Sequence, residues 1–467
     1  MKNLFERIML LLILLLLIVI IILLLRCRCC SEKDPVQPTG KSRYGNQLIV
    51  WRNPAFTTTD FEKWIKDSVE ALGTISNRTY CASCDGDLVM LTGAGPNNYI
   101  VGQTNTGSGG TGKSGGPTGG DGPVYYSVNF AMNISDSVNK YDSLNVGRVE
   151  GFGGAPVTVA VFDTGADSLE VDNFLYANND PSCLGPLSNN GWNFFNKTYD
   201  WKDDFPTRHG SIVSRFIINQ VKAYGHNSVK ILPVKIHSRH GVGNLFDVLC
   251  GFAYAANRKA QIINASFGFY VANRSTTSTT ELDSSALLLK KYVQHYLTEK
   301  NILLIAAAGN KDDLNEDAVY STTDTLAKRN LDSVSFYPAS LARELQNVIA
   351  VTTVSDPSST TVSVSPHQNY SSNVVDIGVN ADTVVGDKYL FQNPRIFTPG
   401  KTVEGSSFAT PIVTGKICAN YFLIESMLTG TTPVNKGTLL DVLRTNSLLH
   451  INSGLASKIK RGLIMTK

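Results

Sequence analysis

Four polar side chains in this chain are of the types that a covalent hydrolase needs. Ser407 stands in the small-residue segment GSSFATP, and His209 opens the segment HGSIVSRFI. Asp163 and Asn310 each come at the end of an apolar run. A serine hydroxyl becomes a strong nucleophile when an imidazole takes its proton and a carboxylate holds that imidazole in one tautomer. The set predicts acyl transfer, with the roles of nucleophile for Ser407, base for His209, orienting carboxylate for Asp163 and oxyanion donor for Asn310.

The neighbouring runs predict how the chain positions these residues. Residues 157–162 and 302–308 are short and apolar, which is typical of buried strands in a parallel sheet. Catalytic groups of such sheets stand at the carboxyl ends of the strands. His209 and Ser407 instead precede runs that are expected to form helices. The positive end of a helix favours the negative oxygen of an acyl-transfer intermediate. The pattern predicts an α/β fold with a mostly parallel sheet.

These segments resemble the motifs of the subtilisin-like serine proteases, the subtilases of peptidase family S8. The matching motifs are Asp163-Thr164-Gly165, His209-Gly210-Ser211, Gly309-Asn310 and the segment from Gly405 to Pro411. Ser211 and Ser406 stand where the family has Thr, so a hydroxyl is kept. The order Asp, His, Ser along the chain is that of subtilisin. The resemblance covers roughly residues 150–425 and implies a three-layer fold, with helices on both faces of the sheet, and serine endopeptidase activity.

The resemblance also implies where the substrate lies. The backbone of Ser266, Phe267 and Gly268 is expected to pair with the bound peptide, and Ala307, Ala308 and Gly309 to surround the first subsite. Their small size indicates a roomy, apolar pocket. No cofactor is expected for the chemistry. Structural calcium is common in the family, but the spacing of the acidic residues identifies no ligands for it.

Other functions are compatible with some of these residues. The segment FDTGAD around Asp163 also resembles aspartic proteases, but the second Asp-Thr/Ser-Gly of a two-lobed enzyme is missing from the sequence. Two alternatives stay open. One is an acyl-enzyme transpeptidase or cyclase, in which an amine replaces water as the acceptor. The other is a catalytically silent scaffold with the same fold.

Two sequence patterns resemble a nucleotide-binding site and a metal site, but the neighbouring residues do not support either. GSGGTGKS at residues 107–114 matches the phosphate-binding P-loop, which needs a strand before it and a helix after it. Here Gly, Asn, Thr and Pro surround it, so residues 93–123 are interpreted as a Gly-rich linker and nucleotide binding is not expected. His237 and His240 lack a nearby carboxylate or cysteine cluster and are expected in a solvated loop.

The N-terminus predicts a membrane anchor within residues 1–30. Residues 8–25 form an unbroken apolar run, about 27 Å long as a helix, which nearly spans a bilayer core. More Lys and Arg follow this run than precede it, which favours a cytoplasmic catalytic domain. The habit of the family favours the opposite, extracytoplasmic side. The membrane side therefore stays open.

Between the anchor and the linker, residues 45–92 read as strand, helix and strand. This resembles part of the propeptide that precedes many subtilases, and an unrelated accessory module is the alternative. Exposed Gly-rich segments are easily cut, so processing is expected in the linker. Cys81 and Cys84 form a CxxC pair, for which a local disulfide and two free thiols both stay open. The catalytic domain is assigned to residues 150–450.

The charge balance bears on partners. The formal net charge is +3 over 467 residues, which indicates no polyanionic partner such as nucleic acid. The expected partners are protein or peptide substrates and, through residues 8–25, a membrane.

Overall fold

The computed structural model describes residues 43–81, 84–105, 122–134, 156–178, 182–185, 188–224, 228–271, 279–310, 329–355, 362–365, 368–381, 403 and 405–465. The apolar run 8–25 and the P-loop-like segment 107–114 lie outside this set. Among the residues inside it, no helix is long and apolar enough to cross a membrane. Residues 42–467 belong to one compact unit, which contains all the described elements.

A nine-stranded sheet forms the centre of this unit, in the order β15-β16-β14-β13-β11-β9-β5-β7-β6. Its strands are β5 (Val157–Asp163), β6 (Trp192–Asn193), β7 (Val229–Lys235), β9 (Ile262–Ala265), β11 (Leu303–Ala307), β13 (Val348–Thr353), β14 (Ile377–Val379), β15 (Leu449–Ile451) and β16 (Leu463–Met465). All neighbours pair parallel except β15 and β16. The predicted, mostly parallel α/β sheet is confirmed.

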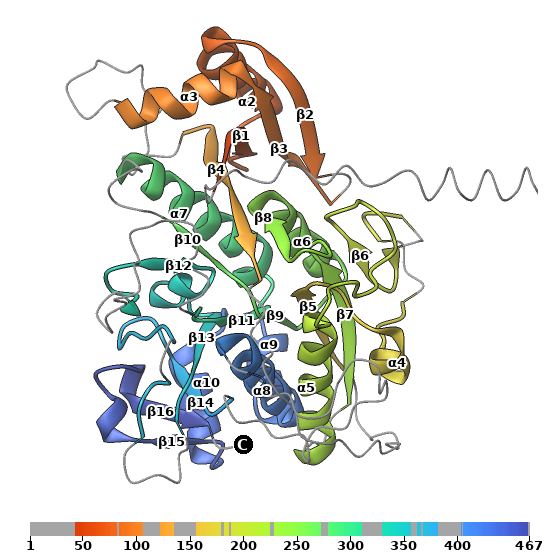
Figure 1. The fold of residues 1–467 in the computed structure, drawn as a ribbon, viewed down its shortest axis with the longest axis vertical. Coiled ribbons are helices and arrows are strands. Elements are labelled where there is room, and N and C mark those ends of the chain that lie inside the picture. Colours follow the sequence, from red (N-terminus) through yellow and green to blue (C-terminus); the bar gives the residue numbers. More distant parts are fainter. Residues whose placement is uncertain are drawn as a thin grey trace, which may run out of the picture. The chain divides into compact units, whose positions relative to one another are not determined.

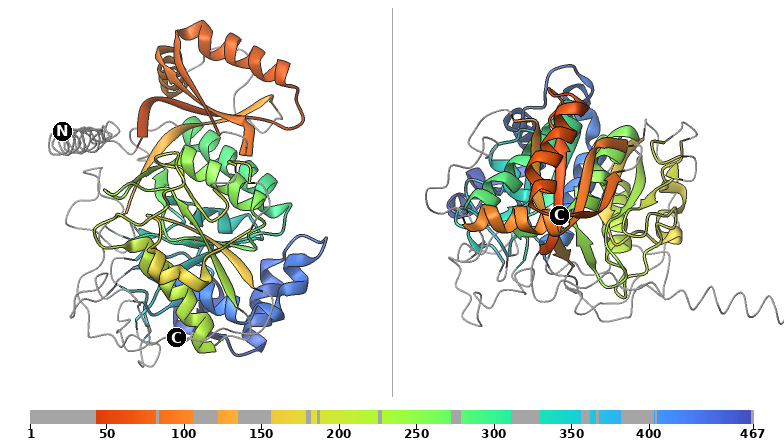
Figure 2. Two further views of the ribbon diagram at one scale, coloured as in Figure 1. Left: turned by 90° about the vertical axis from the view of Figure 1, so that its right-hand side faces the viewer. Right: turned by 90° about the horizontal axis from the view of Figure 1, so that it is seen from above.

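Helices cover both faces of this sheet (Figures 1 and 2). On one face, α5 (His209–Tyr224) and α8 (Ser406–Ala419) pack in the cluster that contains Val157, Val159 and Val161 of β5. On the other, α6 (Leu245–Asn257) and α7 (Thr279–Val293) pack in the cluster that contains Ala160 and Phe162. Alternate residues of a strand point to opposite faces, so a strand buried on both sides must be apolar throughout. This explains the continuous apolar run before Asp163.

The remaining elements of the catalytic domain lie around this core. They are α4 (Ser168–Val171), β8 (Val242–Asn244), β10 (Phe269–Val271), β12 (Ser335–Tyr337), α9 (Glu425–Thr429) and α10 (Lys436–Thr445). Strands β15 and β16 belong to the main sheet, so the expected boundary at residue 450 falls inside β15 and is too early. The catalytic domain of the structure is taken below as residues 156–465.

The N-terminal module, residues 43–134, is larger than expected. It contains β1 (Arg43–Arg52), α2 (Thr58–Trp64), β2 (Ile75–Cys81), β3 (Asp85–Gly93), α3 (Ala94–Asn105) and β4 (Val124–Asn133). Its antiparallel strands follow the order β2-β3-β1-β4. The linker expected at residues 93–123 was therefore wrong in part, because α3 occupies its first half and β4 returns to the sheet after it. Gly, Pro and Asn are poor helix formers, which hid α3 in the sequence.

Candidate active site

Asp163 and His209 form a buried pair at the carboxyl edge of the sheet. Asp163 is the last residue of β5 and His209 the first of α5, and both side chains are at most 1% exposed. The His209 Nδ1 lies 2.8 Å from the Asp163 Oδ1, which also accepts the Thr164 N–H at 2.7 Å. An ionised carboxylate only accepts hydrogen bonds, so Nδ1 carries the proton. Nε2 is then the basic nitrogen of the imidazole.

The segment of Ser407 lies against this pair. Ser407 is half-buried in the first turn of α8, and the ring of its neighbour Phe408 lies 5.0 Å from the His209 ring, measured between centroids. Gly405 precedes the helix with φ 110°, and a Cβ there would meet the Asn310 Oδ1 at 3.0 Å. Only glycine fits both the backbone and this close approach. The turn therefore brings Ser407 to the edge that carries Asp163 and His209.

Asn310 is fixed by Ser406, the neighbour of the nucleophile. The Asn310 Oδ1 accepts the Ser406 N–H at 2.9 Å and the Ser406 hydroxyl at 3.0 Å. The hydroxyl in turn accepts the Gly309 N–H at 3.0 Å. The oxygen of the amide is thus held toward Ser406, which turns its Nδ2 donors to the other side. The Gln368 Oε1 also accepts the Ser406 N–H, at 3.0 Å, a contact that the sequence did not reveal.

A second buried carboxylate, Asp203, joins the elements that carry the pair. Its Oδ1 accepts the Thr164 hydroxyl at 2.9 Å, and its Oδ2 accepts the Ser211 N–H at 2.9 Å and hydroxyl at 2.7 Å. Thr164 follows Asp163, and Ser211 lies two residues after His209. Burial raises the pKa of Asp203. Asp203 therefore ties the end of β5 to the start of α5. The acidic doublet six residues before His209 was the only signal for it in the sequence.

Comparison with known proteins agrees with this geometry. A model of the subtilase family, Peptidase S8, matches residues 154–421, more than half of the chain. The chain belongs to the subtilase family. Members of this family are serine-type peptidases that need no cofactor for catalysis.

The relatives of this subtilase are distant. It is 27% identical over 186 residues to subtilisin-like protease 3 of Plasmodium falciparum (isolate 3D7). This alignment covers 40% of this chain and 21% of the relative. It is also 27% identical over 265 residues to the thermophilic serine proteinase of Bacillus sp. (strain AK1). This second alignment covers 55% of this chain and 50% of the relative. The chain thus matches at most half the length of these relatives.

A solved structure shares the fold of the subtilase. Fervidolysin from Fervidobacterium pennivorans, described as a keratinolytic enzyme related to subtilisin, superposes with a TM-score of 0.52 at 14% identity. The superposition covers 90% of this chain and 60% of fervidolysin. At this identity the likeness concerns the fold alone.

The segments expected to bind substrate lie at the same edge. Ser266, Phe267 and Gly268 follow β9. Ala307 is the last residue of β11, Ala308 and Gly309 follow it, and all six residues are buried. A Cβ on Gly268 would meet the Phe336 ring at 2.2 Å. The two strands are parallel neighbours, so their ends lie side by side. Substrate binding by these segments stays a prediction.

His237 of the subtilase is not in a solvated loop, and that expectation was wrong. Its side chain is fully buried, and its ring lies 5.7 Å from that of Phe267 between centroids. Burial lowers the pKa of His237 to about 4, so the ring is neutral at pH 7. His240 is exposed, as expected. Among the described residues, no group of three or more His, Cys, Asp or Glu side chains could hold a metal ion.

The last strand of the N-terminal module enters the catalytic domain beside this edge. In Figure 1, β4 runs from the module along β8, and the pairing is antiparallel with Met132 opposite Gly243. The Ile134 N–H donates to the Gly241 oxygen at 2.9 Å. On its other side, the Phe130 ring stacks on Phe269 at 5.3 Å between centroids. Phe269 directly follows Gly268, so β4 lies between β8 and the segment expected to bind the substrate.

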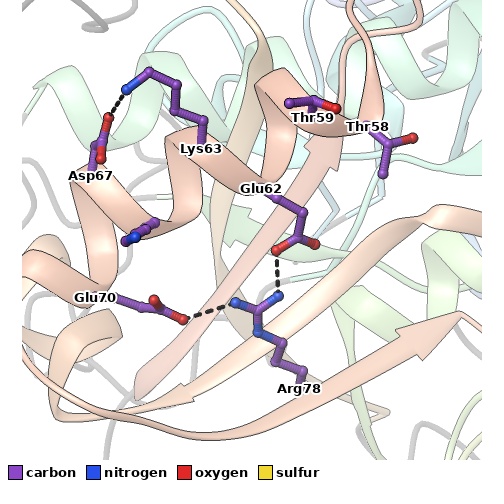
Figure 3. A pocket seen from close by; sticks show the side chains of 8 residues that line it. Thr58, Thr59, Glu62, Lys63, Asp67, Glu70 and Arg78 are labelled. Carbon is purple, nitrogen blue, oxygen red and sulfur yellow. Dashed lines mark hydrogen bonds and ion pairs between the residues drawn. The ribbon is translucent and has the colours of Figure 1, made fainter.

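A hollow of about 610 Å³ on the module is not part of this site (Figure 3). It is lined by Thr58, Thr59, Glu62, Lys63, Lys66, Asp67, Glu70 and Arg78, all from the module. The Arg78 guanidinium pairs with Glu62 at 2.8 Å and Glu70 at 2.9 Å, and Lys63 pairs with Asp67. These partly exposed pairs account for the charges of the hollow other than that of Lys66, while the chemistry lies at the edge of the main sheet.

Proposed function

We propose that this subtilase is a membrane-anchored serine endopeptidase that works through an acyl-enzyme. The contact that carries the proposal is the buried hydrogen bond between His209 and Asp163, beside the helix start that holds Ser407. A buried, oriented imidazole next to a serine in the first turn of a helix is the arrangement that activates a hydroxyl.

In this mechanism the Ser407 Oγ attacks the carbonyl carbon of the scissile peptide bond. The His209 Nε2 accepts the serine proton and gives it to the leaving amine, while Asp163 stabilises the imidazolium. The Asn310 Nδ2 and the Ser407 N–H donate to the oxyanion of the tetrahedral intermediate. Water, activated by the same imidazole, then releases the acyl group and restores the serine.

The substrate would extend along the edge as an added strand. The backbone of residues 266–268 would pair with the peptide on one side, and the small side chains of residues 307–309 leave room for the side chain before the scissile bond. The position of β4 between β8 and Phe269 supports this placement, because the module's own chain already lies there as a strand.

We further propose that the N-terminal module is a propeptide that blocks the cleft. Processing in the Gly-rich segment, as first expected, would leave β4 paired with both β1 and β8. A cut that frees the cleft must instead fall between β4 and β5, where the chain passes from the module to the catalytic domain.

The run 8–25 is proposed as a single membrane span, with the catalytic domain on the extracytoplasmic side. The excess of Lys and Arg after the apolar run opposes this side, and the location of most members of the family favours it. A disulfide between Cys84 and Cys183 supports it, because such bonds persist in oxidising compartments. Protease added to intact cells should digest the catalytic domain; protection of the domain by an intact membrane would contradict this orientation.

The catalytic proposal is tested with Ser407→Ala. Removal of the nucleophile is expected to lower turnover by about 10⁶-fold while peptide binding is kept. On a reducing gel, wild type should also have lost the module, and Ser407→Ala should stay full length. Mass analysis of the products of a test peptide separates hydrolysis from transfer to an amine. Unchanged turnover in Ser407→Ala, with binding intact, would exclude Ser407 as the nucleophile.

A further inference from the structure

The CxxC pair of the module is split between two partners in the catalytic domain. Cys84 forms a disulfide with Cys183, 99 residues further along the chain. Cys81 and Cys250 are both free and buried, and their thiols are neighbours. The module and the catalytic domain are therefore joined by a covalent bond that is independent of the chain between β4 and β5.

We propose that the Cys84–Cys183 disulfide keeps the module on the catalytic cleft after the chain between β4 and β5 is cut, so that the cleft opens only when this bond is reduced. The inference rests on the proposed function, because it takes the module to be the inhibitor of the peptidase. Cleavage and reduction would then both be required for activity.

The other contacts of the module can separate without breaking a covalent bond. They include the β4–β8 pairing, the Phe130–Phe269 stack, a contact between the Trp51 and Tyr292 rings, whose centroids lie 5.0 Å apart, and the hydrogen bond between the Ser127 and Ser285 hydroxyls at 2.9 Å. A tethered partner is held at an effective concentration of about millimolar. Once the tether is lost, the concentration of the module falls to that of the protein itself. Dilution then removes an inhibitor that the tether would keep bound.

The chemistry of release needs a dithiol as reductant. One of its thiolates attacks either sulfur of the disulfide, and the other cysteine leaves as a thiolate that takes up a proton. The second thiol of the reductant then displaces the protein cysteine and closes a cyclic disulfide, so the reductant loses two electrons and the protein gains two. Cys84 and Cys183 are half-buried, whereas Cys81 and Cys250 are buried. The disulfide is the more accessible of the two cysteine pairs.

The tether is tested first, without any need for self-processing. Ser407→Ala protein, purified without reductant, is cut with trypsin, for which Lys140 and Arg148 are the target side chains between β4 and β5. On a denaturing gel, the fragments that carry Cys84 and Cys183 should run together without dithiothreitol and apart with it. Adding Cys84→Ser should separate them in both lanes. Cys81→Ala is the matched control and should behave like its parent. Fragments of the parent that separate without reductant would overturn the proposal.

The gating is tested by activity. Cut wild-type protein, with the trypsin quenched, should be nearly inactive at nanomolar concentration, and dithiothreitol should raise its rate by about tenfold or more. Cut Cys84→Ser protein should be active without reductant. A tethered, cut protein that is already fully active would overturn both the gating and the inhibitory role of the module. Separated fragments with an inhibited catalytic domain would overturn the tether alone.

Discussion

The catalytic edge and the contact between module and catalytic domain lie side by side but are built differently. At the catalytic edge, buried polar groups fix one another: Asp203 holds Thr164 and Ser211, and Ser406 holds Asn310. At the contact with the module, a short antiparallel ladder and aromatic rings are supplemented by one disulfide.

The difference follows from what each region has to do. Groups that stabilise a transition state must be oriented before the reaction, and buried hydrogen bonds do this because breaking any of them leaves a polar group unpaired. A contact that must later open cannot depend on such networks alone. Apolar packing and a reducible bond hold it until a second event releases it.

Outside Asp163, His209 and Ser407, the substitution expected to weaken the catalytic edge most is Asn310→Ala. Loss of one oxyanion donor is expected to lower kcat by about 10²–10³-fold with KM nearly unchanged. Ser406→Ala should reproduce part of this loss, because it removes the hydroxyl that orients the amide. Ser406→Thr keeps the hydroxyl and should retain most of the activity. An equal loss in both Ser406 variants would show that the hydroxyl does not position Asn310.

Asp203→Asn tests whether Asp203 positions the pair or only stabilises the fold. The amide cannot accept all the hydrogen bonds that the carboxylate accepts, so Asp163 and His209 should lose their alignment and kcat should fall about 10²-fold. Removing a nearby negative charge should also lower the pKa seen on the acid limb of kcat/KM. A fall in melting temperature with an unchanged kcat and pH profile would leave Asp203 a structural role alone.

Phe130→Ala weakens the other region. Loss of the buried ring should cost about 2 kcal/mol of module binding, so the cut and reduced protein should stay active up to a roughly thirtyfold higher concentration. Tyr80→Ala, on an exposed part of β2, is the control and should leave this concentration unchanged. Equal effects of the two variants would mean that β4 does not anchor the module.

His237 lies between the two regions, and its expected effect is on the stability of the fold. Its folded pKa of about 4 is below the usual 6.5, so the unfolded chain binds the proton first as the pH falls. The fold should therefore lose about 2 kcal/mol through this group between pH 7 and pH 5. Asp163, His209 and Lys235 surround it and modify the value.

The measurement is a comparison of variants, because other groups titrate in the same range. Burial raises the pKa of Asp247 to about 7, which changes stability in the opposite sense. His237→Leu should lose less stability than wild type in urea unfolding between pH 7 and pH 5, while His240→Leu, in an exposed position, should match wild type. Parallel curves for all three proteins would contradict the buried, neutral state of His237.

The sequence predicted the catalytic residues that lie in recognisable local motifs. It missed the residues whose role depends on a partner far away in the sequence. Asp163, His209, Asn310 and Ser407 each lie at or near the end of an element whose apolar pattern is readable. Asp203 acts through Thr164, which lies 39 residues before it. Cys84 pairs 99 residues away, so no local pattern could choose Cys183 over Cys81. Strand β4 was missed because the Gly-rich segment before it resembles a linker. Its role also depends on its pairing with β8.

The central claim is that Ser407 is an activated nucleophile whose cleft the module covers. Labelling with a fluorophosphonate probe, located by mass spectrometry, tests both parts at once. We expect a Ser407 adduct in wild type after cutting and reduction, little adduct in the cut but unreduced protein, and none in His209→Ala. Absence of the adduct under all conditions, or equal labelling of His209→Ala, would contradict the account.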